Sequence, residues 1–234
     1  MFRISVIIPV LNDAESLEAQ RSWLDAVQAQ GHEIIVVDGG SRDHSRGIAA
    51  EITTRVLDSD RGRALQMNTG AEAARGDLLM FLHADTRLGP QALDSLLGQV
   101  KNCGNEFWGR FDVRLDGEHR LYRLIETMMN LRSRLTGIAT GDQAMFVSRA
   151  LFDRVEGFPR IPLMEDVALS KRLRKCAAPV CLRQRAVAST RRWARHGILE
   201  TTLLMWRLRL SYFFGADPAR LARIYYGPGR HTSR

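Results

Sequence analysis

Cysteine is scarce in this sequence, and long uncharged apolar runs are missing. Its 234 residues include three cysteines and no CxxC pair, which argues against both a disulfide framework and a zinc site. No uncharged apolar run reaches the roughly 18 residues that a membrane-spanning helix needs. The first apolar run begins almost at once, without a charged leader or a cleavage site. We therefore expect a protein that is made and kept in the cytoplasm.

Aromatic residues are also few, at 7%, whereas positive charge is in excess, with a formal net charge of +8. A charge of this sign indicates anionic partners such as nucleotide phosphates, acidic membrane surfaces or nucleic acid. A nucleic-acid binder needs an exposed basic stripe with interleaved aromatics. Because the arginines of this chain are scattered and its aromatics few, we expect no nucleic-acid partner. The length and the hydrophobic content of 45% fit one sizeable globular domain.

The first hundred residues alternate between strand and helix patterns. Apolar runs predict strands at 4–11, 33–41, 54–59 and 77–85, and periodic segments predict helices at 14–30, 43–52, 63–75 and 90–101. Asp13 is a candidate N-cap for the first of these helices. Repeated βαβ units with near-continuous apolar strands predict an α/β fold with a parallel sheet covered on both faces.

The second half of the chain is less regular. An alternating pattern over 107–116 predicts a more exposed strand, and 119–135 carries the apolar stripe of an amphipathic helix. A last helix is predicted over 197–214, with Arg207 and Arg209 off its apolar face. Two uses of this basic helix stay open, namely packing on the domain and lying on an anionic membrane surface. Packing is the interpretation that we favour.

Carboxylates stand where two of the predicted strands end, at Asp38 and Asp85. Open α/β sheets bind ligands at the carboxyl edge of their strands, so both are candidate ligand contacts. Asp38 can accept hydrogen bonds from a ribose or a base, and Gly39 lets a ligand approach the backbone. A cap of the strand-to-helix turn explains Asp38 equally well.

Three further residues belong to the same predicted edge. Pro9 and Asn12 stand at the tip of the first strand, where a structural role in the turn is the simpler interpretation. Arg63 stands at the start of a helix, where a guanidinium can neutralise a diphosphate. A solvated surface arginine is the commoner fate of such a residue.

Together and in this order, the motifs resemble those of the family 2 glycosyltransferases, the inverting sugar-nucleotide enzymes with the GT-A fold. The resemblance rests on VIIPVLND, VVDGGSRD, the segment 63–70, GDLLMFLHADT, TGDQAMFVSR, MED and RRW, which span Ile4 to Trp193. The tail ILETTLLMWRLRL followed by DPARLARIYYG is similar to a compact bacterial subgroup often met near arsenosugar or selenium-related genes. Some members of that subgroup carry names that imply carotenoid or lipid glycosylation.

The resemblance implies a Rossmann-like GT-A fold in one glycosyltransferase domain over residues 1–234. A nucleotide-sugar-binding half would occupy 1–110, and a mixed-sheet acceptor half would occupy 111–195. A helical C-terminal extension would follow over 196–234.

The resemblance also assigns roles on the donor side. Asp38 and Gly39 would contact the nucleotide, with the Pro9 to Asn12 loop beside them, and Arg63 would sit near the diphosphate.

His83-Ala84-Asp85 occupies the place of the family's DxD motif. Asp85 would therefore bind Mg²⁺ or Mn²⁺ that bridges the diphosphate, because such hard ions need few protein carboxylates. His83 stands where many members have an acid, and it would contact the ribose or help to hold the metal.

Glu165-Asp166 matches the family's ED motif, whose aspartate is the general base. Asp166 would take the proton of the acceptor hydroxyl as that oxygen attacks the anomeric carbon. The alternative is that both acids merely begin a helix, where they suit its dipole. In this motif series we favour the catalytic role for Asp166 and expect Glu165 on the acceptor side.

Two other segments are assigned to the acceptor side. Gly141-Asp142-Gln143 would line it, although a turn that caps the next strand is a serious alternative. Arg192 and Trp193 match part of the QxxRW motif of processive members, but Ser189 stands where the glutamine would be. Trp193 can stack on a sugar and Arg192 can hold a phosphate. The missing glutamine favours transfer of a single sugar over polymerisation.

The predicted function is therefore a metal-dependent, hexosyltransferase-type transfer. One sugar would move from a UDP- or GDP-sugar to a hydroxyl of a small-molecule or lipidic acceptor. The alternatives are transfer to a polyprenyl phosphate and a non-catalytic role in binding nucleotide sugars or nucleic acid. Lipidic acceptors, and a membrane contact through 198–214, would place the protein at the inner face of the plasma membrane.

Overall fold

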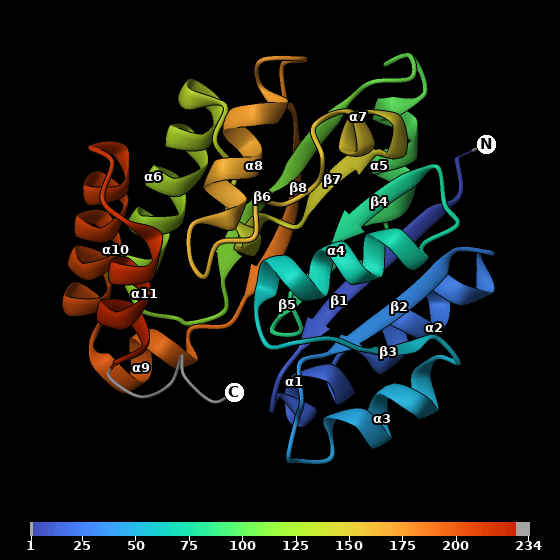
Figure 1. Cartoon of the computed structure of the whole chain (residues 1–234), viewed down its shortest axis with the longest axis horizontal. Helices are drawn as coiled ribbons and strands as arrows, with labels where there is room; N and C mark the ends of the chain where they lie inside the picture. The colour runs from blue at the N-terminus through green and yellow to red at the C-terminus, as the bar shows by residue number, and fades with distance from the viewer. Residues whose placement is uncertain (1, 228–234) are drawn as a thin grey trace.

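A computed structural model describes residues 2–227, and it contains one eight-stranded mixed sheet in the order β3-β2-β1-β4-β7-β6-β8-β5 (Figure 1). The strands are β1 (Ile4–Val10), β2 (Glu33–Asp38), β3 (Val56–Asp58), β4 (Leu78–Phe81), β5 (Thr86–Leu88), β6 (Trp108–Leu115), β7 (Met145–Ser148) and β8 (Val180–Ala188). Residues 228–234, the end of the expected extension 196–234, lie outside the described residues.

The strands β1 to β4 confirm the parallel sheet that is predicted for the first hundred residues. β1 pairs in parallel with β2 and β4, and β2 pairs in parallel with β3. Every residue of β1, β2 and β4 is buried. Alternate residues of β1 face opposite layers, with Val6 and Ile8 in one core cluster and Ile7 in another. Burial of both faces is why these strands are apolar at nearly every position.

Helices cover both faces of the sheet. The helices are α1 (Ala14–Glu18), α2 (Arg21–Ala29), α3 (Ser45–Ile52), α4 (Arg63–Ala73), α5 (Ala92–Val100), α6 (Arg120–Thr136), α7 (Arg149–Arg154), α8 (Glu165–Leu173), α9 (Arg191–His196), α10 (Ile198–Phe213) and α11 (Pro218–Tyr226), with a 3-10 turn η1 (Gly141–Gln143). Residues of α1, α2, α3 and α5 join one core cluster, and those of α4, α7 and α8 join the other.

The single helix predicted over 14–30 is wrong, because the chain forms α1 and α2 with a break at Ala19–Gln20. The Gln20 side chain is buried and donates a hydrogen bond to the carbonyl of Ala84 in the turn after β4. Asp13 makes no capping hydrogen bond to α1, and its carboxylate accepts one from Arg191 at 2.7 Å.

A strand does form within 107–116, but the prediction that it is exposed is wrong. β6 lies inside the sheet between β7 and β8, and six of its eight residues are buried. Arg110, whose charge favours a solvent-facing strand, is fully buried. β5 was not predicted, and it forms the far edge of the sheet against β8. Residue 110, at which the two expected halves meet, lies within β6.

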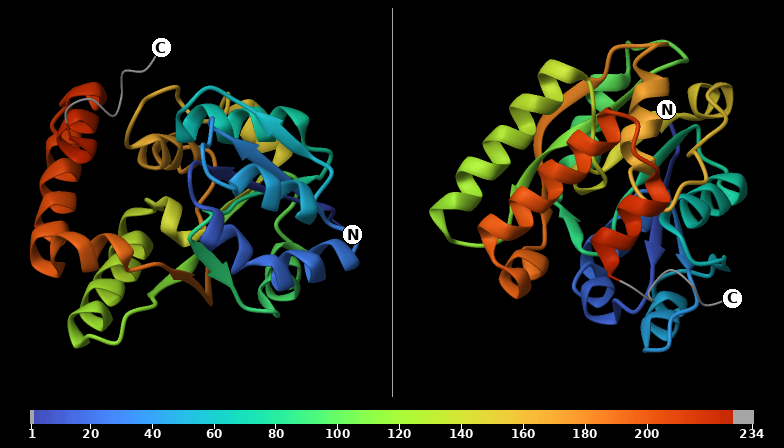
Figure 2. Two further views of the ribbon diagram at one scale, coloured as in Figure 1. Left: turned by 90° about the horizontal axis from the view of Figure 1, so that it is seen from below. Right: turned by 60° about the vertical axis from the view of Figure 1, so that its left-hand side comes forward.

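The C-terminal helices form a layer at one end of the sheet, where Figure 2 shows α10 beside α11 and next to α6. The expectation that α10 packs its apolar stripe on the domain is wrong. Its stripe of Leu199, Leu203, Trp206, Leu210 and Phe213 is 51–72% exposed, and the opposite face packs through Leu208. Within residues 2–227, no helix is long and apolar enough to cross a bilayer.

Candidate active site

The carboxyl ends of β1 and β2 are joined by a network of side-chain to backbone hydrogen bonds. Asp38, which is buried, accepts hydrogen bonds from the N–H groups of Gly40 and Ser41. Asn12 has a φ of 52° and accepts a hydrogen bond from the N–H of Arg42 at 2.7 Å. Both side chains thus shape the loop after β2, which is the capping role that the sequence left open for Asp38.

Two other residues at this edge, Pro9 and Gln66, are held in place by the strands β1 and β2. Pro9 lies inside β1 opposite Val37 and is buried. Gln66 of α4 approaches Gly39 and donates hydrogen bonds to the carbonyls of Val10 and Val37 at 2.9 and 2.8 Å. No motif of the sequence marks Gln66, which lies between Leu65 and Met67 inside a predicted helix.

The predicted strand 77–85 ends early, at Phe81, and after Leu82 the residues His83-Ala84-Asp85 lie at the carboxyl end of β4. His83 is buried, and burial together with the charge of Arg63 lowers the pKa of its imidazole to about 3. The imidazole is therefore neutral at physiological pH. Burial raises the pKa of Asp85, which is half-buried, and nearby Arg63 opposes that rise.

The turn η1 brings Gly141 and Asp142 onto His83. A side chain at Gly141 would meet the imidazole, since a Cβ there would lie 2.1 Å from His83 Cε1. Asp142 Oδ1 lies 4.0 Å from His83 Nδ1, with 32% of the Asp142 side chain exposed. Loss of water on its other sides, and repulsion from Asp85, raise the pKa of Asp142 to about 6. Gln143 is fully buried and caps the turn with Thr140.

Asp166 lies in the first turn of α8, and two backbone groups hold its carboxylate. One oxygen accepts a hydrogen bond from the N–H of Gly141 at 2.9 Å, and the other accepts one from the N–H of Val167 at 2.7 Å. Burial raises the pKa of Asp166 against these hydrogen bonds. The preceding Met164 has a φ of 68°, a conformation that costs free energy for a non-glycine residue and is often found at functional sites.

Glu165 is buried beside Asp166. Burial and the neighbouring carboxylate raise the pKa of Glu165 to about 7, while Arg63 opposes the rise. The two acids therefore titrate as a pair, because the charge of Asp166 disfavours the ionised form of Glu165.

Arg63 begins α4 and is the cation toward which these acids converge. Tyr225, Tyr226, Glu165 and Asp85 raise the pKa of its guanidinium above its ordinary value, against the opposing effect of lost hydration. Arg63 nevertheless remains solvent-exposed. A charged, accessible guanidinium beside these acids can hold an anionic ligand.

The side chains of Arg192 and Trp193, which belong to the RRW motif, pack against different parts of the protein. The guanidinium of Arg192 stacks 3.7 Å from the ring centroid of Tyr225 and donates a hydrogen bond to its carbonyl at 2.8 Å. Trp193 packs edge-on against Tyr122 of α6, at 6.4 Å between ring centroids. Arg192 thus holds α11 beside Arg63, and Trp193 belongs to a separate hydrophobic cluster with Val113.

Arg132 of α6 is a site residue that the sequence analysis missed. Within the described residues, its two terminal nitrogens are buried without a hydrogen-bond partner. Burial lowers its pKa to about 10, and Asp166 and Asp142 oppose that change. In the sequence it lies within a helix that is predicted from its apolar stripe, and no motif marks it.

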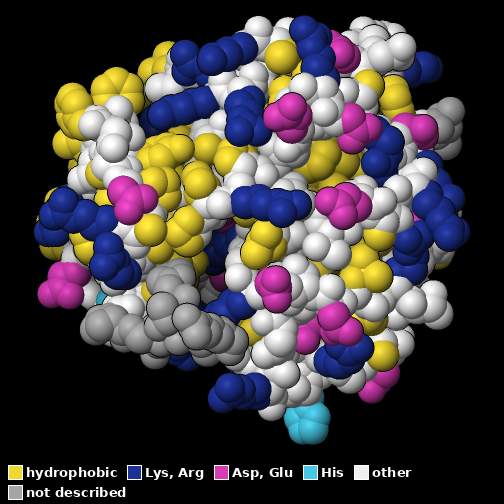
Figure 3. Space-filling view, in the orientation of Figure 1, with side chains coloured by type: hydrophobic (Ala, Val, Ile, Leu, Met, Phe, Trp, Pro, Cys, Tyr) yellow, Lys and Arg dark blue, Asp and Glu magenta, His cyan; other side chains and the backbone are white. Residues whose placement is uncertain are grey.

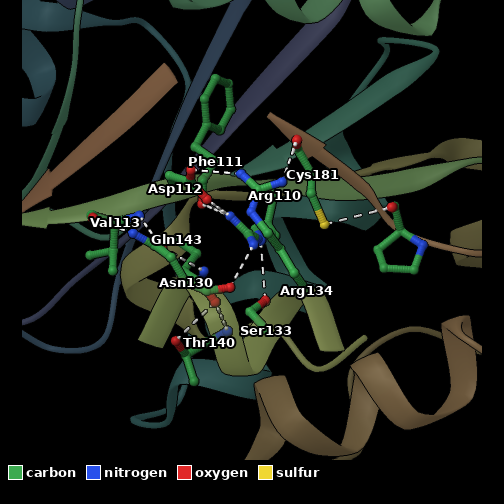
Figure 4. Close-up of polar contacts among 11 residues, drawn as sticks. Arg110, Phe111, Asp112, Val113, Asn130, Ser133, Arg134, Thr140, Gln143 and Cys181 are labelled. Carbon is green, nitrogen blue, oxygen red and sulfur yellow. Dashed lines mark hydrogen bonds and ion pairs between the residues drawn. The ribbon is translucent and has the colours of Figure 1, made fainter. Parts of the chain in front are cut away.

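A buried network anchored by Arg110 holds η1 and α6 in place (Figure 4). Arg110 is fully buried, pairs with Asp112, and donates hydrogen bonds to Ser133 Oγ and the Asn130 carbonyl at 3.1 and 3.2 Å. The Asn130 amide bonds both backbone groups of Val113. The network therefore ties β6 to the helix that carries Arg132.

We expect Arg110→Met to lower the free energy of unfolding by about 3 kcal/mol, because it leaves buried hydrogen-bond acceptors unpaired. Denaturant unfolding measures this change. Arg114→Met on the same strand is the matched control, since Arg114 is exposed and should change stability little. Equal effects of the two substitutions would contradict a structural role for the network.

The acids of this site could hold a divalent cation only if the phosphates of a bound substrate supplied further oxygen ligands. Within residues 2–227, no three His, Cys, Asp or Glu side chains form a ready-made metal site. The carboxylate of Asp85 nevertheless raises the pKa of Asp142, so the site gathers negative charge that a cation would relieve. Mg²⁺ commonly binds through one carboxylate, water and substrate phosphates. Asp85 therefore fits as the protein ligand of such an ion.

Comparison with curated proteins finds relatives among sugar transferases. The chain is 33% identical over 152 residues to undecaprenyl-phosphate 4-deoxy-4-formamido-L-arabinose transferase of Pseudomonas fluorescens, covering 59% of this chain and 44% of that protein. It is 32% identical over 118 residues to glycosyltransferase AglE of Haloferax volcanii, covering 45% and 38%. The match therefore spans less than half the length of either relative.

Solved structures share the fold. TarS 1–349 of S. aureus aligns with a TM-score of 0.60 and 17% identity, over 79% of this chain and 57% of that one. Glucosyl-3-phosphoglycerate synthase of Mycobacterium tuberculosis, in complex with Mg²⁺ and uridine diphosphate, aligns with a TM-score of 0.57 and 18% identity, over 80% and 70%. The observed mixed sheet is thus that of the GT-A glycosyltransferases. The model of glycosyl transferase family 2 matches residues 5–154, and the chain belongs to this family.

Proposed function

We propose that the chain transfers one sugar from a nucleotide-sugar donor, with inversion, to a hydroxyl of a small-molecule or lipidic acceptor. The observation that carries the proposal is the anchored carboxylate of Asp166. It accepts a hydrogen bond from Gly141 of the turn η1, and Gly141 and Asp142 of that turn lie against His83 at the carboxyl end of β4. A fixed, partly dehydrated carboxylate in a ligand crevice has the properties of a general base.

In the proposed reaction, the acceptor oxygen attacks the anomeric carbon while its proton passes to Asp166. The bond from that carbon to the nucleoside diphosphate breaks on the opposite face, so the configuration inverts. Arg63 counters the negative charge that develops on the departing diphosphate. The proton then leaves Asp166 to solvent, which restores the base.

Donor binding would use the edge formed by β1, β2 and the His83 turn. The loop held by Asn12 and Asp38 would face the nucleoside, and neutral His83 can donate or accept a hydrogen bond to the ribose. Mg²⁺ or Mn²⁺ bound through Asp85 would neutralise charge on the diphosphate.

Transfer to a polyprenyl phosphate is the second candidate, and Arg132 is the observation that favours it. Its unpaired, buried N–H groups near Asp142 and Asp166 suit an anionic group on the acceptor. A relative carries an undecaprenyl-phosphate transferase name, which is consistent with this class. A phosphate acceptor needs no base, so the two candidates differ in their dependence on Asp166.

The test is a thermal-unfolding screen of UDP, GDP and their sugars, with and without Mn²⁺, followed by a turnover assay. A ligand at about 100 times its Kd should raise Tm by roughly 5 °C or more. Stabilisation by one base identifies the donor class, and a requirement for Mn²⁺ supports the Asp85 site. The absence of any shift and of any turnover would contradict the proposal. Binding without turnover, for hydroxyl and polyprenyl-phosphate acceptors alike, would leave a non-catalytic nucleotide-sugar binder.

A further inference from the structure

Two neighbouring helices turn stripes of large apolar side chains to solvent. In α6 the stripe is Leu124, Met128, Leu131 and Leu135, which are 41–77% exposed. In α10 and at its end it is Leu199, Leu203, Trp206, Leu210, Phe213 and Phe214, which are 51–77% exposed. We call these ten residues the α6–α10 face. Hydrophobic side chains gather on the same side of the molecule in Figure 3.

The α6–α10 face is distinct from the surfaces by which the two helices pack. At about 100° per residue, the α10 stripe from Leu199 to Phe213 stays within about 40° of one line, and Leu208 points the opposite way. Leu208 is 1% exposed and packs in a cluster with Val167 of α8. In α6, Ser133 likewise lies opposite the stripe and is 1% exposed. Each helix therefore packs on the protein through one side and turns an apolar stripe to solvent on the opposite side.

The two stripes belong to one region of the surface. Ile198, at the start of α10, packs in the same cluster as Ile125 and Met129 of α6. Figures 1 and 2 show the two helices as neighbours at the end of the sheet. An exposed apolar region of this extent marks an interaction surface.

Positive charge borders this region. On the helical wheel, Arg207 and Arg209 fall about 80° to either side of the α10 stripe. The segment 191–227 contains seven arginines against two acidic residues. An apolar stripe between arginines is the pattern of a helix that lies in the interface of an anionic bilayer.

We propose that the α6–α10 face docks the protein on the surface of an anionic lipid bilayer. The apolar side chains would enter the level of the acyl chains, and Arg207 and Arg209 would meet lipid phosphates. A second copy of this chain is the less suitable occupant, because a symmetric dimer would bring the same arginines of two molecules together, and each molecule carries +8.

Docking in this way would bring the acceptor side of the site to the membrane, since α6 also carries Arg132. This step rests on the proposed function and names its acceptor as lipid-borne. Lipid binding itself does not depend on catalysis, so the two ideas can fail separately.

The test is flotation of the full chain with vesicles of phosphatidylcholine alone or enriched in phosphatidylglycerol. We expect binding to the anionic vesicles, weakened by salt. Leu203→Glu/Trp206→Glu should bind at least about tenfold more weakly, and Leu131→Glu on α6 should also bind more weakly. Ala50→Glu/Gln99→Glu is the matched control, because it adds the same charge at exposed positions of α3 and α5.

Circular dichroism and nucleotide binding report whether each variant is folded. Equal binding by the α10 variant and the control would overturn the proposal, as would no binding to anionic vesicles. Light scattering tests the other occupant. A stable dimer that Leu203→Glu/Trp206→Glu splits into monomers would assign the face to a second copy instead.

Discussion

Asp166→Asn should lower kcat by about 10²–10⁴-fold, because an amide cannot take the acceptor proton. Donor binding should remain within a few-fold of the wild type. Asparagine keeps the shape of the side chain, and its one oxygen can still accept a hydrogen bond from one of the two N–H groups, Gly141 or Val167. Turnover assays and the Tm shift with donor nucleotide separate these two effects.

Asp153→Asn is the matched control, since Asp153 is an exposed carboxylate of α7 and should leave turnover unchanged. Full activity of Asp166→Asn with every hydroxyl acceptor would remove Asp166 as the base. If this variant kept activity only with a polyprenyl phosphate, the second candidate function would replace the first.

Glu165 is the neighbour that could replace Asp166 as the base, and its environment favours another role. Burial and the charge of Asp166 raise its pKa to about 7, so only about half of it is ionised at neutral pH. Its ionised form is also drawn toward Arg63. We therefore assign the proton transfer to Asp166, whose carboxylate is held by the N–H groups of Gly141 and Val167.

The parallel half of the fold was predictable because its strands are buried on both faces. Runs such as 4–10 then show apolar residues at nearly every position, a pattern that few other structures produce. The break between α1 and α2 was not predictable from local sequence. It is set by Gln20, which meets Ala84 at a distance of 64 residues along the chain.

The burial of β6 and the exposure of α6 and α10 share one physical reason. Periodicity shows that a helix or strand has a distinct face, and it does not show what covers that face. Arg110 is buried because Asn130 and Ser133 of α6 accept its hydrogen bonds. The apolar stripe of α10 faces solvent because the opposite side, through Leu208, already packs on α8.

Only those residues of the candidate site that stand in sequence motifs could be predicted. His83 and Asp85 stand in a motif at the end of β4, at one edge of the sheet, and Asp166 stands in a motif at the start of α8. Arg132 lies in the middle of a helix and gains its position only from tertiary packing. The motif predicts that Trp193 lies on the acceptor side, whereas its ring packs against Tyr122 of α6.

Gly141→Ala should lower kcat/KM by about 100-fold, although it adds one methyl group. A Cβ at this position would lie 2.1 Å from Cε1 and 2.4 Å from Nε2 of His83, whose buried ring has little room to move. The turn must therefore shift away from the imidazole. That shift would disturb both Asp142 and the 2.9 Å hydrogen bond that holds Asp166, and displacements of about 1 Å cost this much in rate.

Gly98→Ala in α5 is the control for the Gly141 substitution, because a Cβ at Gly98 meets no atom within 4 Å. The control should keep full activity and should match or slightly exceed the wild type in stability. Steady-state kinetics with both substrates distinguish the causes. A loss confined to kcat indicates a displaced base, whereas a raised KM for the donor alone indicates that His83 has moved. If Gly141→Ala were as active as Gly98→Ala, the close approach of η1 to His83 would have no part in catalysis, and the position of Asp166 would depend on α8 alone.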